Sequence, residues 1–171
     1  MDVQHLLDRH YPGRYPGTRP PVNLLAKSVS FPASEGKRIL IVDDDPYFRG
    51  LLKLMLAQTG LPVTEICEAE ESRTALTLCR EQTFDLVFCD LNLPCPWSSN
   101  GIEIVQQIRK IRQNLPVYMV TAENEEDLIE DVRSSGATGH ILKPVSLRIV
   151  KRVLGATFLW RKTNSVDAGK Q

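Results

Sequence analysis

Short apolar runs alternate along the chain with segments in which apolar residues recur every three or four positions. Four of the runs end directly on a polar residue: 39–42 on Asp43, 86–89 on Asp90, 117–120 on Thr121 and 141–142 on Lys143. Continuous runs of this length, rich in β-branched residues, are typical of parallel strands that are buried on both faces. The pattern therefore predicts a buried sheet whose strands end in polar side chains.

The complete pattern predicts five strands and five helices in alternation. The strands are expected near residues 38–43, 63–68, 84–90, 116–121 and 138–142. The helices are expected near residues 46–59, 70–82, 101–113, 124–135 and 146–160. Gly60 and Gly136 stand where a helix favours a left-handed stop, and Asn124 and Ser146 stand where a helix favours a side-chain cap. Repeated strand–helix units indicate an α/β protein with a parallel sheet between two helical layers.

The chain divides into one domain and two tails. Residues 1–36 are rich in proline and show little apolar periodicity, so we expect a flexible N-terminal extension, with a docking peptide as the alternative. Residues 37–160 carry the strand and helix signals and form the expected domain. Residues 161–171 are polar and unpatterned, and we expect a disordered C-terminal tail that is too short for an effector domain.

Composition narrows the classes of partner and compartment. The 21 basic and 21 acidic side chains balance, so no global field favours nucleic acid or an anionic membrane as a partner. No segment approaches the roughly 20 apolar residues that span a bilayer, and the N-terminus lacks a secretory pattern. The four cysteines lack metal-ligand spacing, and we interpret them as small core residues of a cytoplasmic protein.

Functional side chains in an open α/β sheet gather just outside the carboxyl ends of the strands. Asp43, Asp44 and Asp90 are therefore expected to lie close together, and each like-charged pair costs about 4 kcal/mol at roughly 4 Å and an effective dielectric constant of about 20. Lys143 supplies one compensating charge. Mg²⁺ is the simplest remaining partner for an all-oxygen cluster, because it takes one or two carboxylates and shares its shell with phosphate oxygens.

Asp90 ends the third expected strand and is the natural nucleophile of this cluster. Attack of its carboxylate on phosphorus would give an aspartyl phosphate. Lys143 and the hydroxyl group of Thr121 would bind the phosphoryl oxygens on which charge develops in the transition state. The sequence therefore indicates phosphoryl-transfer chemistry.

Several separated motifs resemble the receiver domain of bacterial two-component response regulators, and of the single-domain chemotaxis regulators in particular. They are the run 39–46 with its three aspartates, Asp90 followed by Pro94, the pair Thr121-Ala122, and the segment 136–144 that ends in Lys143-Pro144. The resemblance covers about residues 37–160. It implies a doubly wound, flavodoxin-like fold with five parallel strands in the order 2-1-3-4-5.

The resemblance also implies a function, that of a phosphorylation-dependent response regulator. Asp90 would accept a phosphoryl group from a sensor histidine kinase or a phosphotransfer protein. Asp43, Asp44, Asp90 and the backbone carbonyl of Asn92 would hold Mg²⁺, and Lys143 would form an ion pair with the phosphate. No enzymatic activity is expected beyond the receiver's own phosphorylation and dephosphorylation.

Further positions are implied to act in switching. Thr121 would move toward the phosphate, and His140 occupies the position of the family's usual aromatic switch residue. Asn92 and Glu123 occupy positions that tune how fast the phosphate is lost. The Lys143-Pro144 bond is expected to be cis. The loop at residues 95–100 is about three residues longer than is usual, which places Trp97 beside the site as a shield, a partner contact or a cover for the sheet edge.

The implied output is a contact with a downstream protein that the sequence does not name. The face formed by the fourth helix, the fifth strand and the fifth helix carries acidic residues on one helix and basic residues on the other, which also suits a homodimer. Two alternatives remain open. A magnesium-dependent phosphatase or phosphotransferase would need a second acid at position 92, which is Asn, and a receiver-like scaffold would not need the intact acid set.

Overall fold

The computed structural model describes residues 36–93, 101–122 and 126–159. Within these residues, five strands form one parallel sheet in the order β2-β1-β3-β4-β5. The strands are β1 (Lys37–Val42), β2 (Val63–Ala69), β3 (Leu86–Asp90), β4 (Val117–Thr121) and β5 (Gly139–Leu142). The α/β class and the strand order expected from the sequence are confirmed.

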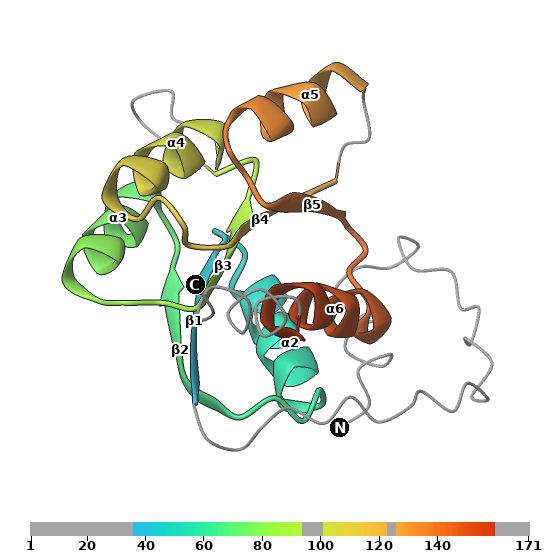
Figure 1. Ribbon diagram of the computed structural model, residues 1–171. Helices are drawn as coiled ribbons and strands as arrows, with labels where there is room; N and C mark the ends of the chain where they lie inside the picture. The colour runs from blue at the N-terminus through green and yellow to red at the C-terminus, as the bar shows by residue number, and fades with distance from the viewer. Residues whose placement is uncertain (1–35, 94–100, 123–125, 160–171) are drawn as a thin grey trace, which may run out of the picture.

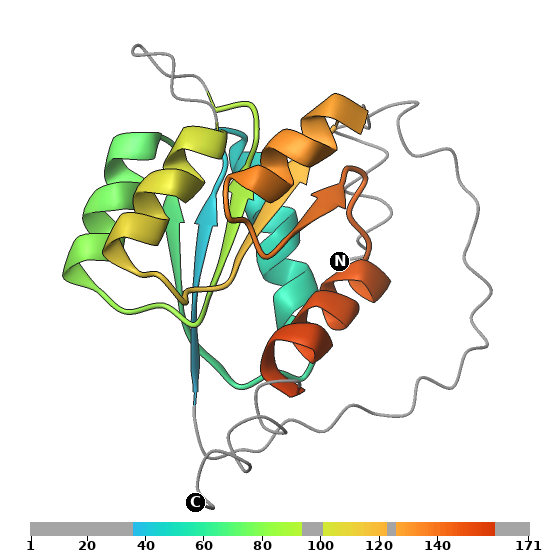
Figure 2. The ribbon, with the colours of Figure 1, turned by 45° about the horizontal axis from the view of Figure 1, so that its top comes forward.

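Helices cover both faces of the sheet (Figures 1 and 2). Helices α2 (Pro46–Ala57) and α6 (Leu147–Leu154) lie on one face, and a wider helical turn, η1 (Gly155–Leu159), continues α6. Helices α3 (Ser72–Glu81), α4 (Gly101–Ile111) and α5 (Glu126–Ser134) lie on the other face. The sheet is thus the middle of three layers.

Strand β1 shows why the apolar runs are continuous. Ile39 and Ile41 belong to the core between the sheet and the helices α2 and α6, whereas Leu40 and Val42 belong to the core beneath α3 and α4. Successive side chains of a strand point to opposite faces, so a strand that is covered on both faces must be apolar at every position. Burying a side chain of this size contributes roughly 1.5–3 kcal/mol.

The ends of several elements differ from the sequence prediction. Helix α2 ends at Ala57 rather than at residue 59, and Gly60 follows with a φ angle of 77°. Helix α6 ends at Leu154 rather than at residue 160, because the backbone widens into η1 there. The predicted cap at Ser146 is confirmed, since its hydroxyl oxygen accepts the backbone N–H of Ile149 at 3.4 Å.

Some predictions fall outside the described residues. They concern the N-terminal extension, the C-terminal tail, the long loop with Trp97, the cap at Asn124, and Glu123. Cys79 and Cys89 are buried, as expected, while Cys67 is only half-buried at the edge strand β2. None of the helices in the described residues combines the length and the apolar character that a membrane span requires.

Gly101 opens α4 directly against the end of β3. Its N–H donates to the carbonyl oxygen of Leu91 at 2.7 Å. A Cβ atom at this position would overlap the backbone carbonyl oxygen of Asp90 and would approach the Cε atom of Met119 to 2.8 Å. Only glycine allows α4 to pack this closely beneath the strand end that carries Asp90.

We therefore expect Gly101→Ala to lower the free energy of unfolding by about 1–3 kcal/mol, the usual cost of overpacking a core. Gly50→Ala is the matched control. Gly50 lies inside α2, and a Cβ atom there would meet no atom within 4 Å, so this change should raise stability by up to about 1 kcal/mol through helix propensity. Urea unfolding of both variants measures the two effects, and equal stability of Gly101→Ala and wild type would contradict the close packing.

Candidate functional site

The carboxyl ends of β1, β3 and β5 bring three charged side chains together. Asp43 directly follows β1, Asp90 is the last residue of β3, and Lys143 directly follows β5. Strands β1 and β3 are hydrogen-bonded neighbours. Asp43 and Asp90 continue the alternation that directs Ile41 and Phe88 toward α2 and α6. The two carboxylates therefore meet at one edge and on one face of the sheet.

Asp43, Asp44 and Asp90 form an all-oxygen cluster. Each of them offers a carboxylate oxygen, and these oxygens all lie within 4.8 Å of one another. Asp43 is 1% exposed and Asp90 is 5% exposed, whereas Asp44 is open to solvent. Two buried carboxylates beside one exposed carboxylate suit a hard cation that keeps part of its water shell, as Mg²⁺ does. The expected meeting of these three side chains is confirmed.

Lys143 bridges the two buried carboxylates. Its Nζ atom lies 3.0 Å from Oδ2 of Asp43 and 2.9 Å from Oδ1 of Asp90. Burial lowers the pKa of Lys143, but the two neighbouring carboxylates outweigh it and raise this pKa above its ordinary value. The lysine therefore stays charged. The Lys143-Pro144 peptide bond is cis, as the resemblance implied.

Hydrogen bonds fix the loop that carries Asp43. Oδ1 of Asp43 accepts the backbone N–H of Asp45 at 2.9 Å, and the carbonyl oxygen of Asp43 accepts from the guanidinium group of Arg49 at 2.6 Å. Arg49 also donates to Glu68 on β2 at 3.1 Å. Sequence reasoning missed Arg49 and Glu68, because their contact depends on how β2 lies beside α2, which no local pattern records.

Burial disfavours the ionised form of the Asp43 carboxyl group. Burial raises its pKa from 3.8 to about 6, Lys143 opposes this rise, and the charge of Asp90 adds to it. Three carboxylates and one ammonium group leave two negative charges in the cluster. A bound divalent cation would neutralise both charges, so the donor set and its charge fit Mg²⁺.

We expect the affinity for Mg²⁺ to depend on pH with a midpoint near 6. The raised pKa means that Asp43 holds a proton below about pH 6, and a proton competes with a metal ion for the same oxygens. The affinity should fall by about tenfold per pH unit below this midpoint and level off above it. Calorimetric Mg²⁺ titrations between pH 5 and pH 8 measure this, and an affinity that stays constant from about pH 5 upward would contradict it.

The remaining predicted site residues lie at or near the same strand ends. Thr121 ends β4 and is buried, and its carbonyl oxygen accepts the backbone N–H of Lys143 at 2.7 Å. The backbone N–H of Asn92 donates to Oδ2 of Asp90 at 3.2 Å, while the Asn92 side chain is exposed. His140 is exposed on β5. The roles assigned to these three residues stay predictions.

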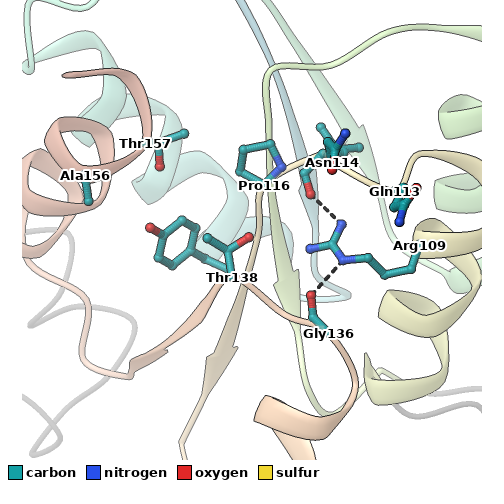
Figure 3. A pocket seen from close by; sticks show the side chains of 10 residues that line it. Arg109, Gln113, Asn114, Pro116, Gly136, Thr138, Ala156 and Thr157 are labelled. Carbon is teal, nitrogen blue, oxygen red and sulfur yellow. Dashed lines mark hydrogen bonds between the residues drawn. The ribbon is translucent and has the colours of Figure 1, made fainter. Parts of the chain in front are cut away.

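A pocket of about 360 Å³ lies at the opposite, amino-terminal ends of β4 and β5. There the Nε atom of Arg109 donates to the carbonyl oxygen of Gly136 at 2.7 Å, and its Nη1 atom donates to the carbonyl oxygen of Leu115 at 2.5 Å (Figure 3). Arg109 thus ties the loop before β4 to the loop before β5. Among the described residues that line this pocket there is no carboxylate, cysteine or histidine, so it contributes no reactive group to the acidic site.

Comparisons with known proteins agree with this geometry. The family described as "Response regulator receiver domain" matches residues 39–154. Chemotaxis protein CheY of Pseudomonas aeruginosa is 32% identical over 123 residues, which cover 71% of this chain and 95% of that protein. Transcriptional regulatory protein SrrA of Staphylococcus aureus is 37% identical over 127 residues, which cover 74% of this chain but only 49% of SrrA.

Solved structures show the same architecture. The CheY-like response regulator receiver domain protein from Methanospirillum hungatei superposes with a TM-score of 0.67 at 26% identity, and the match covers 76% of this chain and 99% of that one. For the chemotaxis protein CheY4 of Vibrio cholerae the TM-score is 0.63 at 26% identity, with 72% and 99% covered. The chain therefore belongs to the family of response regulator receiver domains and is a phosphorylation-dependent regulator of two-component signalling.

Proposed function

We propose that Asp90 is the phosphoacceptor of this receiver domain and that Mg²⁺ is held by Asp43, Asp44, Asp90 and the backbone carbonyl of Asn92. The observation that carries the proposal is the double ion pair of Lys143, which joins the carboxylates of Asp43 and Asp90 at the strand ends. Such a pair places a fixed positive charge directly beside the oxygen atoms of the nucleophile.

The phosphoryl transfer is a nucleophilic displacement at phosphorus. A carboxylate oxygen of Asp90 attacks the phosphorus of a phosphohistidine on the partner kinase or phosphotransfer protein, so an O–P bond forms and the P–N bond breaks. The bonding electron pair leaves with the imidazole, which then takes up a proton. When bound, Mg²⁺ neutralises charge on the phosphoryl oxygens. Lys143 attracts the same oxygens from the side of β5.

Phosphorylation of Asp90 adds negative charge at the carboxyl ends of β1, β3 and β5. We propose that Lys143 then gives up its contact with the Asp90 carboxylate for a phosphoryl oxygen, and that the hydroxyl group of Thr121 moves to a second one. The backbone hydrogen bond from Lys143 to Thr121 joins the two residues. A shift at this point would reach His140 on β5 and the face between α5 and α6, where a downstream protein would bind.

This face also supports a proposal for self-association. Arg148 and Arg152 are exposed on α6, and Glu130 and Asp131 are exposed on α5. Opposite charges on neighbouring helices suit a two-fold homodimer in which each α5 meets the partner's α6. We place the protein in the cytoplasm, where a sensor kinase would reach it, and propose no partner among nucleic acids or membranes.

Acetyl phosphate with Mg²⁺ separates this function from its alternatives, because it supplies a phosphoryl group without a partner protein. A regulator should take up one phosphoryl group per chain and lose it slowly. An independent phosphatase or phosphotransferase would instead turn over added phosphate esters continuously, and Asn92 in place of a second acid argues against that outcome. A scaffold would take up no label, which would contradict the proposal.

A further inference from the structure

Phe48 packs its ring against the ammonium group of Lys143. The Nζ atom lies 4.4 Å from the centroid of the ring. Phe48 stands in the first turn of α2 and is 2% exposed, within the core between the sheet and the helices α2 and α6. Its spacing in the sequence identifies Phe48 only as one of the apolar residues on the buried face of α2. In the fold it touches the charged group at the centre of the site.

The ring of Phe48 is a third neighbour of the half-buried Lys143 ammonium group, beside the carboxylates of Asp43 and Asp90. The ammonium group of Lys143 has three N–H bonds, and it hydrogen-bonds the carboxylates of Asp43 and Asp90. The face of an aromatic ring carries negative charge density and attracts a cation within about 6 Å of its centroid. An aliphatic side chain in the same place would remove water from the ammonium group without returning any attraction.

We propose that Phe48 is a positioning residue for phosphoryl transfer, which holds the ammonium group of Lys143 at the site through a cation–π contact. The proposal rests on the role of Lys143 proposed above. During the transfer, Lys143 has to exchange a carboxylate oxygen for a phosphoryl oxygen. The attraction of the ring does not depend on a particular N–H bond, so it persists while these hydrogen bonds are exchanged.

Progressive fluorination of Phe48 tests this contact with little change in shape. Replacing Phe48 with mono-, di- and trifluorophenylalanine in the full-length chain drains negative charge from the ring face step by step. The rate of labelling by acetyl phosphate at saturating Mg²⁺ should fall with each fluorine atom, to a total loss of about 2- to 30-fold, the range that cation–π strengths imply. Acetyl phosphate serves as donor because it requires no docking partner.

Phe88 provides the matched control. It is 1% exposed in the same core, and in the described part of the chain no cation lies over its ring. Fluorination of Phe88 should leave the labelling rate unchanged, since its packing role resembles that of Phe48 but involves no charge. A second readout is the proton chemical shift at the Cε methylene of Lys143. The ring current of Phe48 should move it upfield, and Phe48→Leu should abolish that displacement.

The outcomes separate the two proposals. Wild-type protein that takes up no label contradicts the proposed function, whatever Phe48 does. If the wild-type protein is labelled and fluorination of Phe48 does not change the labelling rate, only the positioning role is overturned. Equal losses for fluorinated Phe48 and fluorinated Phe88 also overturn it, because they would reveal a packing effect. A normal chemical shift at Lys143 in the wild type would show that the ring does not lie over the ammonium group.

Discussion

Asp90→Asn should abolish labelling by acetyl phosphate under conditions in which the wild-type protein is fully labelled. The amide oxygen of asparagine is a poor nucleophile, and the substitution also removes one of the two carboxylates that pair with Lys143. The side chain keeps nearly the same shape and can still accept the backbone N–H of Asn92, which Asp90 accepts at 3.2 Å. The fold should therefore survive while the reaction is lost.

Asp85→Asn is the control for this substitution. Asp85 stands just before β3, at the end of the strand opposite to Asp90, and accepts the backbone N–H of Arg38 at 2.9 Å. Because an asparagine can make the same hydrogen bond, the variant should fold and should be labelled at the wild-type rate. Labelling that persists in Asp90→Asn would contradict the assignment and would point to another carboxylate of the cluster.

Asp43→Asn should change metal affinity and stability in opposite directions. The affinity for Mg²⁺ should fall by at least about tenfold, or roughly 1.4 kcal/mol, because one buried ligand loses its charge. At pH 7.5 and without metal, the variant should instead be more stable than the wild type. The gain should be on the order of 1–3 kcal/mol, since the pKa of Asp43 is raised from 3.8 to about 6.

The sign of the stability change follows from the direction of that shift. A carboxyl group whose pKa is higher in the folded state destabilises the fold once it ionises. Its penalty grows as the pH rises from about 4 to about 6 and is fully present above that window. The stability difference between Asp43→Asn and wild type, measured by urea unfolding without metal, should therefore widen between pH 4 and pH 6.5. A less stable variant at pH 7.5 would show that the ion pair with Lys143 outweighs burial.

The sequence contained most of the information about where the site lies. A strand that is buried on both faces leaves a continuous apolar run, so the position of its end can be read directly. Parallel strands place all of these ends at one edge, so the apolar runs predict that Asp43, Asp90 and Lys143 lie at the same edge of the sheet. The expectation that the ends of β1 and β3 lie side by side came from the strand order that the resemblance implied, and the structure confirms it.

Sequence periodicity did not predict which side chains of one helix or strand contact those of another. In α4 a helical spacing of three residues joins Ile102 to Val105 and Ile108, which favours Ile102 as a core residue. In the structure Ile104 is the buried one and Ile102 is only half-buried, because the angle at which α4 meets the sheet decides between them. The link from Arg49 to Glu68 and the contact of Phe48 with Lys143 depend on the same kind of geometry. A helical period identifies a face and leaves open what that face touches.

Locating the phosphoryl group in the wild-type protein tests the central claim most directly. The protein is treated with acetyl phosphate and Mg²⁺, the acyl phosphate is reduced with borohydride, and the modified residue is identified by peptide mass spectrometry. We predict a single modification, at Asp90, that does not form when the metal is removed with a chelator. A modification at any other residue, or an unmodified Asp90 in the presence of the metal, would contradict the claim.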